Sequence, residues 1–220
     1  MILSYTEEDY IKGIYHLQQT YNIVSTNQLA SLLEATPASI TDMLKKLKAK
    51  KLLNYEKYKG FHLTAEGKKL SVNIIRRHRL WEYFLVEKLQ FGWDEVHEVA
   101  EELEHVTSKK LVEKLDAFLG HPRFDPHGDP IPDTNGKIIP HVQLNLIDLP
   151  LNTPAEVCSV GSQSSSLLEL LNHKNLNIGS RVEVKKRFGF DHSLEIKVKN
   201  HASITLSQQL AQALFVKIIG

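Results

Sequence analysis

Apolar residues recur at helical spacing through most of the first 120 residues, which predicts a succession of amphipathic helices. The stretches with this spacing are residues 5–20, 24–34, 36–51, 65–90, 97–105 and 108–119. Short alternating runs appear in 52–64 and again beyond about residue 155, and they predict strands. The pattern therefore predicts a mainly α chain with a small β module at its end.

Two of these helices are joined by a short turn. Ser25 and Gln28 form a capping box, and Thr36 caps a second helix that has Pro37 at its first position. Helix, turn and helix in this order are typical of a DNA-binding motif whose second helix enters the major groove. The alternative is an ordinary helical hairpin with a solvated lysine face. The candidate DNA-contacting residues here are Thr26, Thr36, Pro37, Ala38, Ser39, Thr41 and Lys45.

A hairpin is predicted directly after these helices, because alternating runs flank Tyr58-Lys59-Gly60. Such a basic hairpin would form a wing, with Lys57 and Lys59 against phosphate. Thr64 is the expected N-cap of the next helix, as Thr6 is of the first helix. Together these elements predict a winged helix-turn-helix domain.

The stretch 97–105 combines histidines and glutamates at helical spacing. His97, Glu101, Glu104 and His105 would share one side of a helix. Imidazoles beside carboxylates can bind a divalent metal ion. The alternative is an acidic, solvated helix face.

An apolar surface is predicted on the helix before this stretch. It consists of Trp81, Phe84 and Leu85, and it suits either core packing or a homodimer interface.

Charge is unevenly distributed along the 220 residues, although the net charge is only +1. Residues 1–80 carry about +6, residues 81–130 about −7 and the remainder about +2. A basic first third predicts a polyanionic partner, and an acidic middle predicts cations. Cys158 is the single cysteine, so no disulfide framework can form within one chain. With no signal-peptide pattern and no apolar run of about 20 residues, we expect a cytoplasmic protein without a membrane partner.

Five segments in order resemble the diphtheria-toxin-repressor family of metal-dependent regulators, especially its manganese-sensing branch. They are Glu8 to Tyr15, Arg77 to Glu82, Glu101 to His105, Asp125 to Pro132 and Ile178 to Val184. The wing and the helix that follows it, in 55–67, resemble the family as well. The resemblance covers essentially the whole chain. It implies a winged helix-turn-helix domain (1–72), a helical metal-binding and dimerisation domain (73–140) and a C-terminal SH3-like β-barrel (148–220).

The resemblance also implies two metal sites. The principal site would use Asp9, Glu101, Glu104 and His105. A second site would use His78, Glu82 and His97, with Asp125, His127 and Gln163 as further candidates.

The identity of the metal depends on two of these ligands. Iron-sensing members carry Met and Cys where this chain has Asp9 and Glu101, and harder oxygen ligands favour Mn²⁺. Some manganese-sensing relatives have Glu in place of Lys12, so their two-metal arrangement does not transfer whole to this chain.

These features predict a homodimeric, Mn(II)-activated transcriptional repressor that binds a palindromic operator of metal-uptake genes and takes no small organic substrate. An Fe(II)-responsive repressor of the same family is an alternative. A carboxylate–histidine metalloenzyme is another, although the sequence contains no Gly-rich phosphate loop and no nucleophile elbow. A third alternative is a winged-helix DNA-binding protein whose metal is purely structural.

Overall fold

The computed structural model describes residues 3–56, 60–106, 108–140 and 142–219. It divides the chain into two compact units, and three of the helices contribute residues to both. The first unit comprises Met1–His78, Glu102–Val112 and Pro132–Lys137, and the second comprises Arg79–Glu101, Glu113–Ile131 and Ile138–Gly220. No helix in the described residues is both long and apolar enough to cross a membrane.

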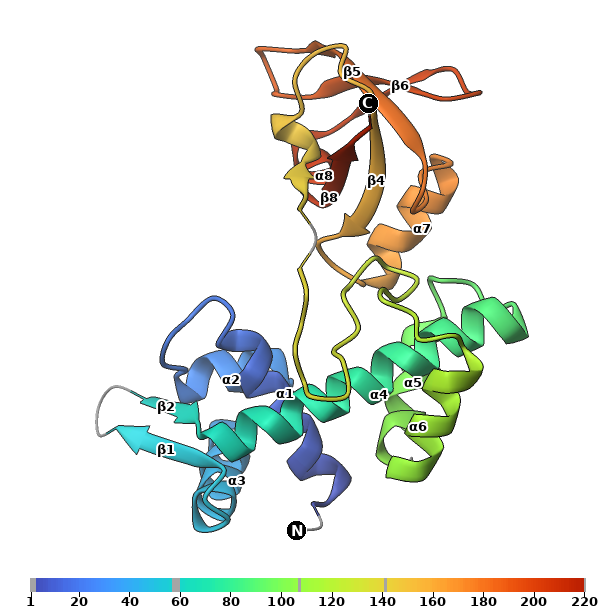
Figure 1. Cartoon of the computed structure of the whole chain (residues 1–220). Helices are drawn as coiled ribbons and strands as arrows, with labels where there is room; N and C mark the ends of the chain where they lie inside the picture. The colour runs from blue at the N-terminus through green and yellow to red at the C-terminus, as the bar shows by residue number, and fades with distance from the viewer. Residues whose placement is uncertain (1–2, 57–59, 107, 141, 220) are drawn as a thin grey trace. The chain divides into compact units, whose positions relative to one another are not determined.

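The first unit contains three short helices and a hairpin (Figure 1). Their bounds are α1 (Tyr5–Leu17), α2 (Thr26–Leu32), α3 (Pro37–Ala49), β1 (Leu53–Glu56) and β2 (Gly60–Leu63). A single apolar core joins them, with Ile11, Leu29 and Phe61 fully buried in it. This arrangement is the winged helix-turn-helix that the sequence predicts.

Local capping signals fix where these helices begin. The Ser25 side chain accepts a hydrogen bond from the Gln28 backbone N–H, and the Gln28 side chain accepts one from the Ser25 backbone N–H, as the predicted capping box requires. Thr36 caps α3, which has Pro37 at its first position, also as predicted. The prediction for the first helix was wrong by two residues. Ser4, and not Thr6, is the N-cap of α1, because Ser4 forms a reciprocal capping box with Glu7.

The wing pairs β1 with β2 in an antiparallel register that matches Leu53 with Leu63. Gly60 at the start of β2 has a φ of +128°, and a Cβ there would lie 2.3 Å from the Val24 carbonyl oxygen. Glycine is therefore required for β2 to approach the segment before α2. The predicted contact residues Lys57 and Lys59 lie outside the described residues.

Three helices connect the winged domain to the C-terminal part: α4 (Ala65–Leu89), α5 (Val96–Val106) and α6 (Lys109–Phe118). In the second unit, Phe84 of α4 lies against Trp81 and Phe118, at ring-centroid distances of 5.6 and 6.3 Å. Phe118 is nevertheless 66% exposed. An aromatic group on α4 and α6 is thus only partly covered by its own chain.

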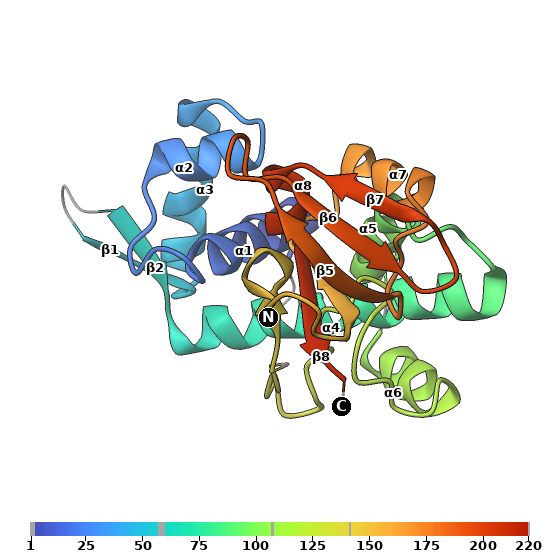
Figure 2. The same ribbon diagram turned by 90° about the horizontal axis from the view of Figure 1, so that it is seen from above.

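The C-terminal part of the second unit is built on a six-stranded antiparallel sheet with the strand order β3-β8-β4-β5-β6-β7. Figure 2 shows β5, β6 and β7 running side by side. The strands are β3 (Leu144–Asn145), β4 (Ala155–Val160), β5 (Arg181–Arg187), β6 (Leu194–Val198), β7 (Ser203–Leu206) and β8 (Leu214–Ile218). A 3-10 turn (Leu146–Asp148), α7 (Ser165–His173) and α8 (Gln208–Gln212) complete this part, whose core includes Val184, Ile196 and Leu214. The mainly α fold with a terminal β module agrees with the prediction.

A tight turn between α6 and the sheet is fixed against β4. Asp125 Oδ1 accepts from the backbone N–H groups of His127 and Asp129, each at 2.9 Å. The Val160 amide of β4 donates to the His127 carbonyl at 3.1 Å. The next residue, Gly128, has a φ of +85°, and a Cβ there would lie 1.9 Å from the Cys158 carbonyl oxygen. The β module therefore holds this turn in place.

We expect Gly128→Ala to lower the free energy of unfolding by about 3 kcal/mol or more, because it adds a backbone clash to the strain of a positive φ. Gly120→Ala is the matched control. Gly120 has a φ of +74° but nothing within 4 Å of an added Cβ, so about 1 kcal/mol is expected there. Guanidinium denaturation of both variants measures the difference. Equal losses would show that the turn does not depend on close packing against β4.

Candidate metal centres and DNA-binding surface

Asp9, Glu104 and His105, here called cluster A, lie together in the first unit, with ligand atoms within 4.8 Å of one another. Helix α1 supplies Asp9, and α5 supplies the other two. His105 Nε2 lies 2.9 Å from Asp9 Oδ1 and 3.6 Å from Glu104 Oε1. Two carboxylates and an imidazole form a donor set suited to a divalent first-row ion.

Neighbouring side chains hold the ligands of cluster A in orientation. His105 Nδ1 donates to Glu8 Oε2 at 2.8 Å, and Arg77 in turn donates to Glu8 at 2.9 Å. Because Nδ1 is engaged, Nε2 is the ring nitrogen that faces Asp9. Neither Glu8 nor Arg77 is among the site residues predicted from the sequence. The signal for Glu8 in the sequence is weak, because an acidic residue in the first turn of a helix ordinarily just complements the helix dipole.

Glu104 is fully buried and bonded through both of its oxygens. His78 Nδ1 lies 2.8 Å from Oε2, and Lys12 Nζ donates to Oε1 at 2.7 Å. Burial by itself raises the pKa of Glu104, but His78 and Lys12 outweigh it and leave the pKa below its usual value. Glu104 is therefore an ionised carboxylate at neutral pH.

Glu101, the fourth predicted ligand of the principal site, is not part of cluster A. It belongs to the second unit, where its Oε1 lies 3.6 Å from His97 Nε2. Its side chain is 48% exposed. Helix α5 places Glu101 one turn before His105, so the two residues lie on the same helix face.

Glu82, Asp125 and His127, here called cluster B, form a second group that is buried within the second unit. Each of the three side chains has a relative exposure of 0%. His127 Nε2 donates to the Trp93 carbonyl at 2.7 Å, because a carbonyl can only accept. The Trp93 ring also stacks on His127, at 5.9 Å between centroids. The other nitrogen, Nδ1, faces Glu82 Oε2 at 3.6 Å.

Two unsatisfied atoms make cluster B a candidate cation site. Among the described residues, Asp125 Oδ2 and His127 Nδ1 are buried and have no hydrogen-bond partner. The Arg79 guanidinium is 3.5 Å from Asp125 Oδ2, beyond hydrogen-bond distance. Buried acceptors are costly to leave unsatisfied. A metal ion bound by Glu82, Asp125 and His127 would satisfy both atoms, and the Trp93 carbonyl already orients the imidazole for it.

Cluster B binds protons tightly when no metal is bound. Burial, and then the charges of Glu82 and Asp129, raise the pKa of Asp125 to about 8. Burial lowers the pKa of His127, but the adjacent Glu82 and Asp125 outweigh it, and the pKa is raised. A metal ion would displace these protons, so its affinity should rise with pH.

The raised pKa of Asp125 predicts how the stability of the metal-free protein depends on pH. Between the carboxyl's ordinary value and about 8, the folded state holds a proton that the unfolded chain has released. Stability should therefore fall as pH rises through this window and level off above it. Urea denaturation in chelator from pH 5 to 9 measures this, with Asp125→Asn as the reference that cannot titrate. Parallel profiles for the two proteins would contradict the prediction.

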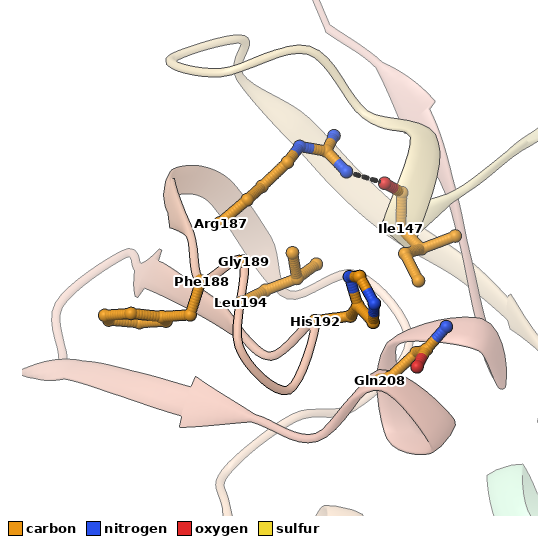
Figure 3. A pocket seen from close by; sticks show the side chains of 7 residues that line it. All are labelled: Ile147, Arg187, Phe188, Gly189, His192, Leu194 and Gln208. Atoms are coloured by element: carbon orange, nitrogen blue, oxygen red, sulfur yellow. Dashed lines mark hydrogen bonds between the residues drawn. The ribbon is translucent and has the colours of Figure 1, made fainter.

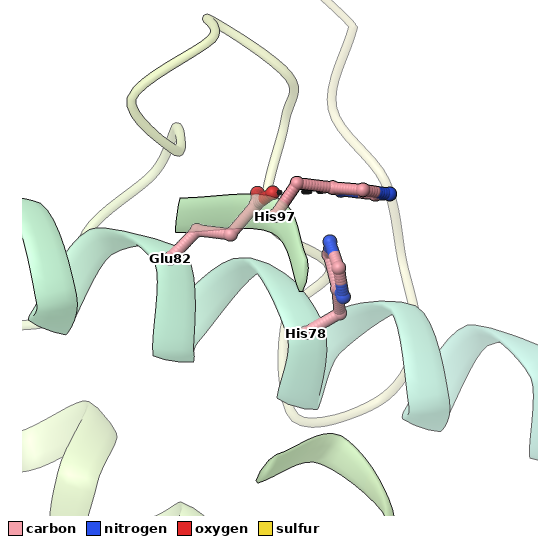
Figure 4. Close-up of side chains that lie close together, drawn as sticks. All are labelled: His78, Glu82 and His97. Atoms are coloured by element: carbon pink, nitrogen blue, oxygen red, sulfur yellow. Dashed lines mark hydrogen bonds and ion pairs between the residues drawn. The ribbon is translucent and has the colours of Figure 1, made fainter. Parts of the chain in front are cut away.

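The remaining predicted ligands are His78, His97 and Gln163. Figure 4 shows Glu82 and His78, which are one turn apart on α4, and His97, whose Nδ1 lies 3.3 Å from Glu82 Oε1. Gln163 donates to Asp129 Oδ2 at 3.1 Å. Asp129 in turn lies 3.4 Å from Arg79. Gln163 therefore contacts a neighbour of Asp125 and not one of the predicted ligands.

The predicted DNA-contacting face of α3 is exposed, from Thr36 to Ser39 and again at Thr41 and Lys45. Thr36 Oγ1 caps the Ser39 amide, and Thr41 Oγ1 donates to the Pro37 carbonyl at 2.8 Å. Lys45 pairs with Asp42 at 3.0 Å, with both side chains more than 70% exposed. Thr26 at the start of α2 is half-buried. Exposed pairs of this kind contribute little stability, so Lys45 can turn to a phosphate at small cost.

A pocket at the β5–β6 hairpin is a separate feature of the second unit (Figure 3). Arg187, Phe188 and His192 contribute to its lining, and Arg187 bonds the Ile147 carbonyl. Its lining residues include no member of cluster A or cluster B.

A winged helix-turn-helix together with carboxylate–imidazole clusters defines the class of metal-responsive DNA-binding proteins. Three family models match in order: "Iron dependent repressor, N-terminal DNA binding domain" at residues 2–61, "Iron dependent repressor, metal binding and dimerisation domain" at 64–133 and "FeoA domain" at 144–218. Together they account for nearly the whole chain.

Relatives and solved structures agree with these matches. The chain is 33% identical to the HTH-type transcriptional regulator MntR of Oceanobacillus iheyensis, covering 54% of this chain and 80% of that protein. It is 26% identical to the iron-dependent repressor IdeR of Mycobacterium tuberculosis, over 96% of each. A manganese-dependent transcriptional repressor in complex with manganese aligns with a TM-score of 0.85 and 30% identity, over 97% of this chain and 100% of that one. ScaR with bound Cd²⁺ aligns with a TM-score of 0.79 and 34% identity, over 97% and 99%.

This chain belongs to the diphtheria-toxin-repressor family, in its manganese-sensing branch. It is a DNA-binding transcriptional repressor and not an enzyme, which excludes the metalloenzyme alternative. The family's middle domain is a dimerisation domain, which agrees with the partly exposed aromatic group on α4 and α6.

Proposed function

We propose that this protein is a homodimeric repressor that Mn²⁺ activates to bind a palindromic operator of metal-uptake genes. Cluster A carries the proposal. One of its ligands, Asp9, stands on α1, the helix that packs Ile11 and Ile14 into the core beneath the DNA-binding helices. Glu104 and His105 come from α5. A metal bound by all three would fix α1 against α5 and so fix the winged domain.

The spacing of the operator half-sites explains why this coupling would change DNA affinity. A helix-turn-helix dimer reads half-sites about 34 Å or a multiple apart, so its two α3 helices must be held at a matching spacing. Fixing α1 restricts where α3 can lie. Metal binding and DNA binding must then strengthen each other by the same factor.

The proposed metal is Mn²⁺, because both clusters, as found among the described residues, consist of carboxylates and imidazoles, and the carboxylate oxygens are hard ligands. Related manganese-dependent repressors support this choice, and the similarity to iron-dependent repressors keeps Fe²⁺ as the second candidate. We assign Asp9, Glu104 and His105 to the activating site, with Glu101 joining from the same helix face. Glu82, Asp125 and His127 are assigned to a second site, with His78 and His97 as further candidate ligands.

DNA-binding anisotropy at fixed salt tests the proposal. A fluorescent duplex from the protein's own promoter region is titrated in chelator, Mn²⁺, anaerobic Fe²⁺ and Zn²⁺, with a scrambled duplex as control. Tight binding that needs Mn²⁺ supports the proposal. Equal affinity in chelator and Mn²⁺ would make the metal purely structural, and activation by Fe²⁺ alone would replace Mn²⁺ with Fe²⁺.

A further inference from the structure

Lys12 forms an ion pair inside cluster A. It lies on α1 one turn after Asp9, and its Nζ is 2.7 Å from Glu104 Oε1. The Lys12 side chain is only 13% exposed, and that of Glu104 is fully buried. This pair is therefore much less screened by water than an ordinary surface ion pair.

The same oxygen is the one that cluster A offers to a metal. Glu104 Oε2 is bonded to His78, while Oε1 is the oxygen that lies 3.6 Å from His105 Nε2. Lys12 and an incoming cation thus meet at Glu104 Oε1. An ammonium ion and a divalent ion close to one oxygen repel each other strongly where the surroundings are poor in water.

We infer that Lys12 is an internal competitor for the metal: its ammonium group neutralises Glu104 in the metal-free protein and weakens metal binding at cluster A. The inference rests on the proposed assignment of cluster A as a metal site. It also explains how Glu104 stays buried and ionised when no metal is bound, since an unpaired buried carboxylate would be strongly destabilising. Lys12 therefore helps to set the Mn²⁺ concentration at which the repressor responds.

Competition and simple support of Glu104 predict opposite results for Lys12→Gln. If Lys12 competes, the variant binds Mn²⁺ more tightly, because the repelling charge is gone. If Lys12 only holds Glu104 in position, the variant binds Mn²⁺ more weakly. Competition further predicts that the metal-free variant is less stable than its parent, while the stabilisation caused by saturating Mn²⁺ is larger.

The experiment uses the full-length chain carrying Glu82→Gln, which removes a ligand from cluster B so that cluster A is measured alone. Mn²⁺ binding is followed by the loss of the free-ion EPR signal, and thermal unfolding is recorded in chelator and in Mn²⁺. Lys12→Gln is compared with Lys12→Arg, which keeps the charge. Lys50→Gln is the matched control. Lys50 Nζ lies 2.6 Å from Oε1 of Glu7, a residue of α1 like Lys12, and neither Lys50 nor Glu7 belongs to either cluster.

We expect Lys12→Gln to lower the Mn²⁺ dissociation constant at least tenfold, with Lys12→Arg and Lys50→Gln within about twofold of the parent. Unchanged or weaker binding in Lys12→Gln, with the parent still binding one Mn²⁺ per subunit, would overturn the role of Lys12 alone. If Lys12→Gln does not fold, Lys12→Met, which also lacks the charge, decides: tighter Mn²⁺ binding supports competition, and unchanged or weaker binding refutes it. A parent that binds no Mn²⁺ would overturn the assignment of cluster A as well.

Discussion

Asp9→Ala should abolish Mn²⁺-dependent DNA binding and leave a folded dimer. Asp9 is the proposed ligand that joins α1 to the cluster on α5, and its Oδ1 lies 2.9 Å from His105 Nε2. Without it, metal bound to α5 no longer restrains α1 and therefore no longer restrains the winged domain. The whole Mn²⁺-induced gain in DNA affinity should vanish, and gains from this kind of coupling are commonly about 5- to 150-fold.

Anisotropy titrations in chelator and in Mn²⁺ measure this loss, and size-exclusion chromatography confirms the dimer. Glu66→Ala is the matched control, since Glu66 is an exposed carboxylate in the first turn of α4, outside both clusters. It should respond to Mn²⁺ as the parent does. Activation of Asp9→Ala at the parent's Mn²⁺ concentration would show that Asp9 is not a ligand.

Glu82→Gln should remove one Mn²⁺ per subunit, the ion assigned to cluster B. Glu82 is completely buried, and glutamine keeps its shape while removing its charge. The loss of a buried charge beside Asp125 also removes one of the causes that raise the pKa of Asp125. The metal-free variant should therefore be at least as stable as the parent, while the stabilisation by Mn²⁺ becomes clearly smaller.

Equilibrium dialysis counts the bound Mn²⁺, and thermal unfolding in chelator and in Mn²⁺ gives the two stabilities. Glu87→Gln is the control, because Glu87 is exposed on the same helix. Glu87→Gln should match the parent in every measurement. An unchanged Mn²⁺ count in Glu82→Gln would refute cluster B as a metal site.

The sequence predicted best what depends on neighbouring residues. The capping box of Ser25 with Gln28 and the cap at Thr36 use partners three residues apart, so helix geometry alone fixes them. Placing Glu104 and His105 on the central helix follows from the same periodicity. The first helix shows how such local reasoning fails: Ser4 and Thr6 are both acceptable caps, and the choice depends on the reciprocal bond to Glu7.

Tertiary structure alone decided which side chains meet across elements. It brought His78 to Glu104 and His97 to Glu82. It joined Asp125 and His127 to Glu82 by packing Gly128 against β4. It also set the Lys12 ammonium on Glu104, where the sequence indicated only that Lys12 replaces a glutamate of some manganese-sensing relatives. Spacing along a helix fixes faces, whereas distances between helices and turns arise from the packing of the whole core, to which residues far apart in the chain contribute.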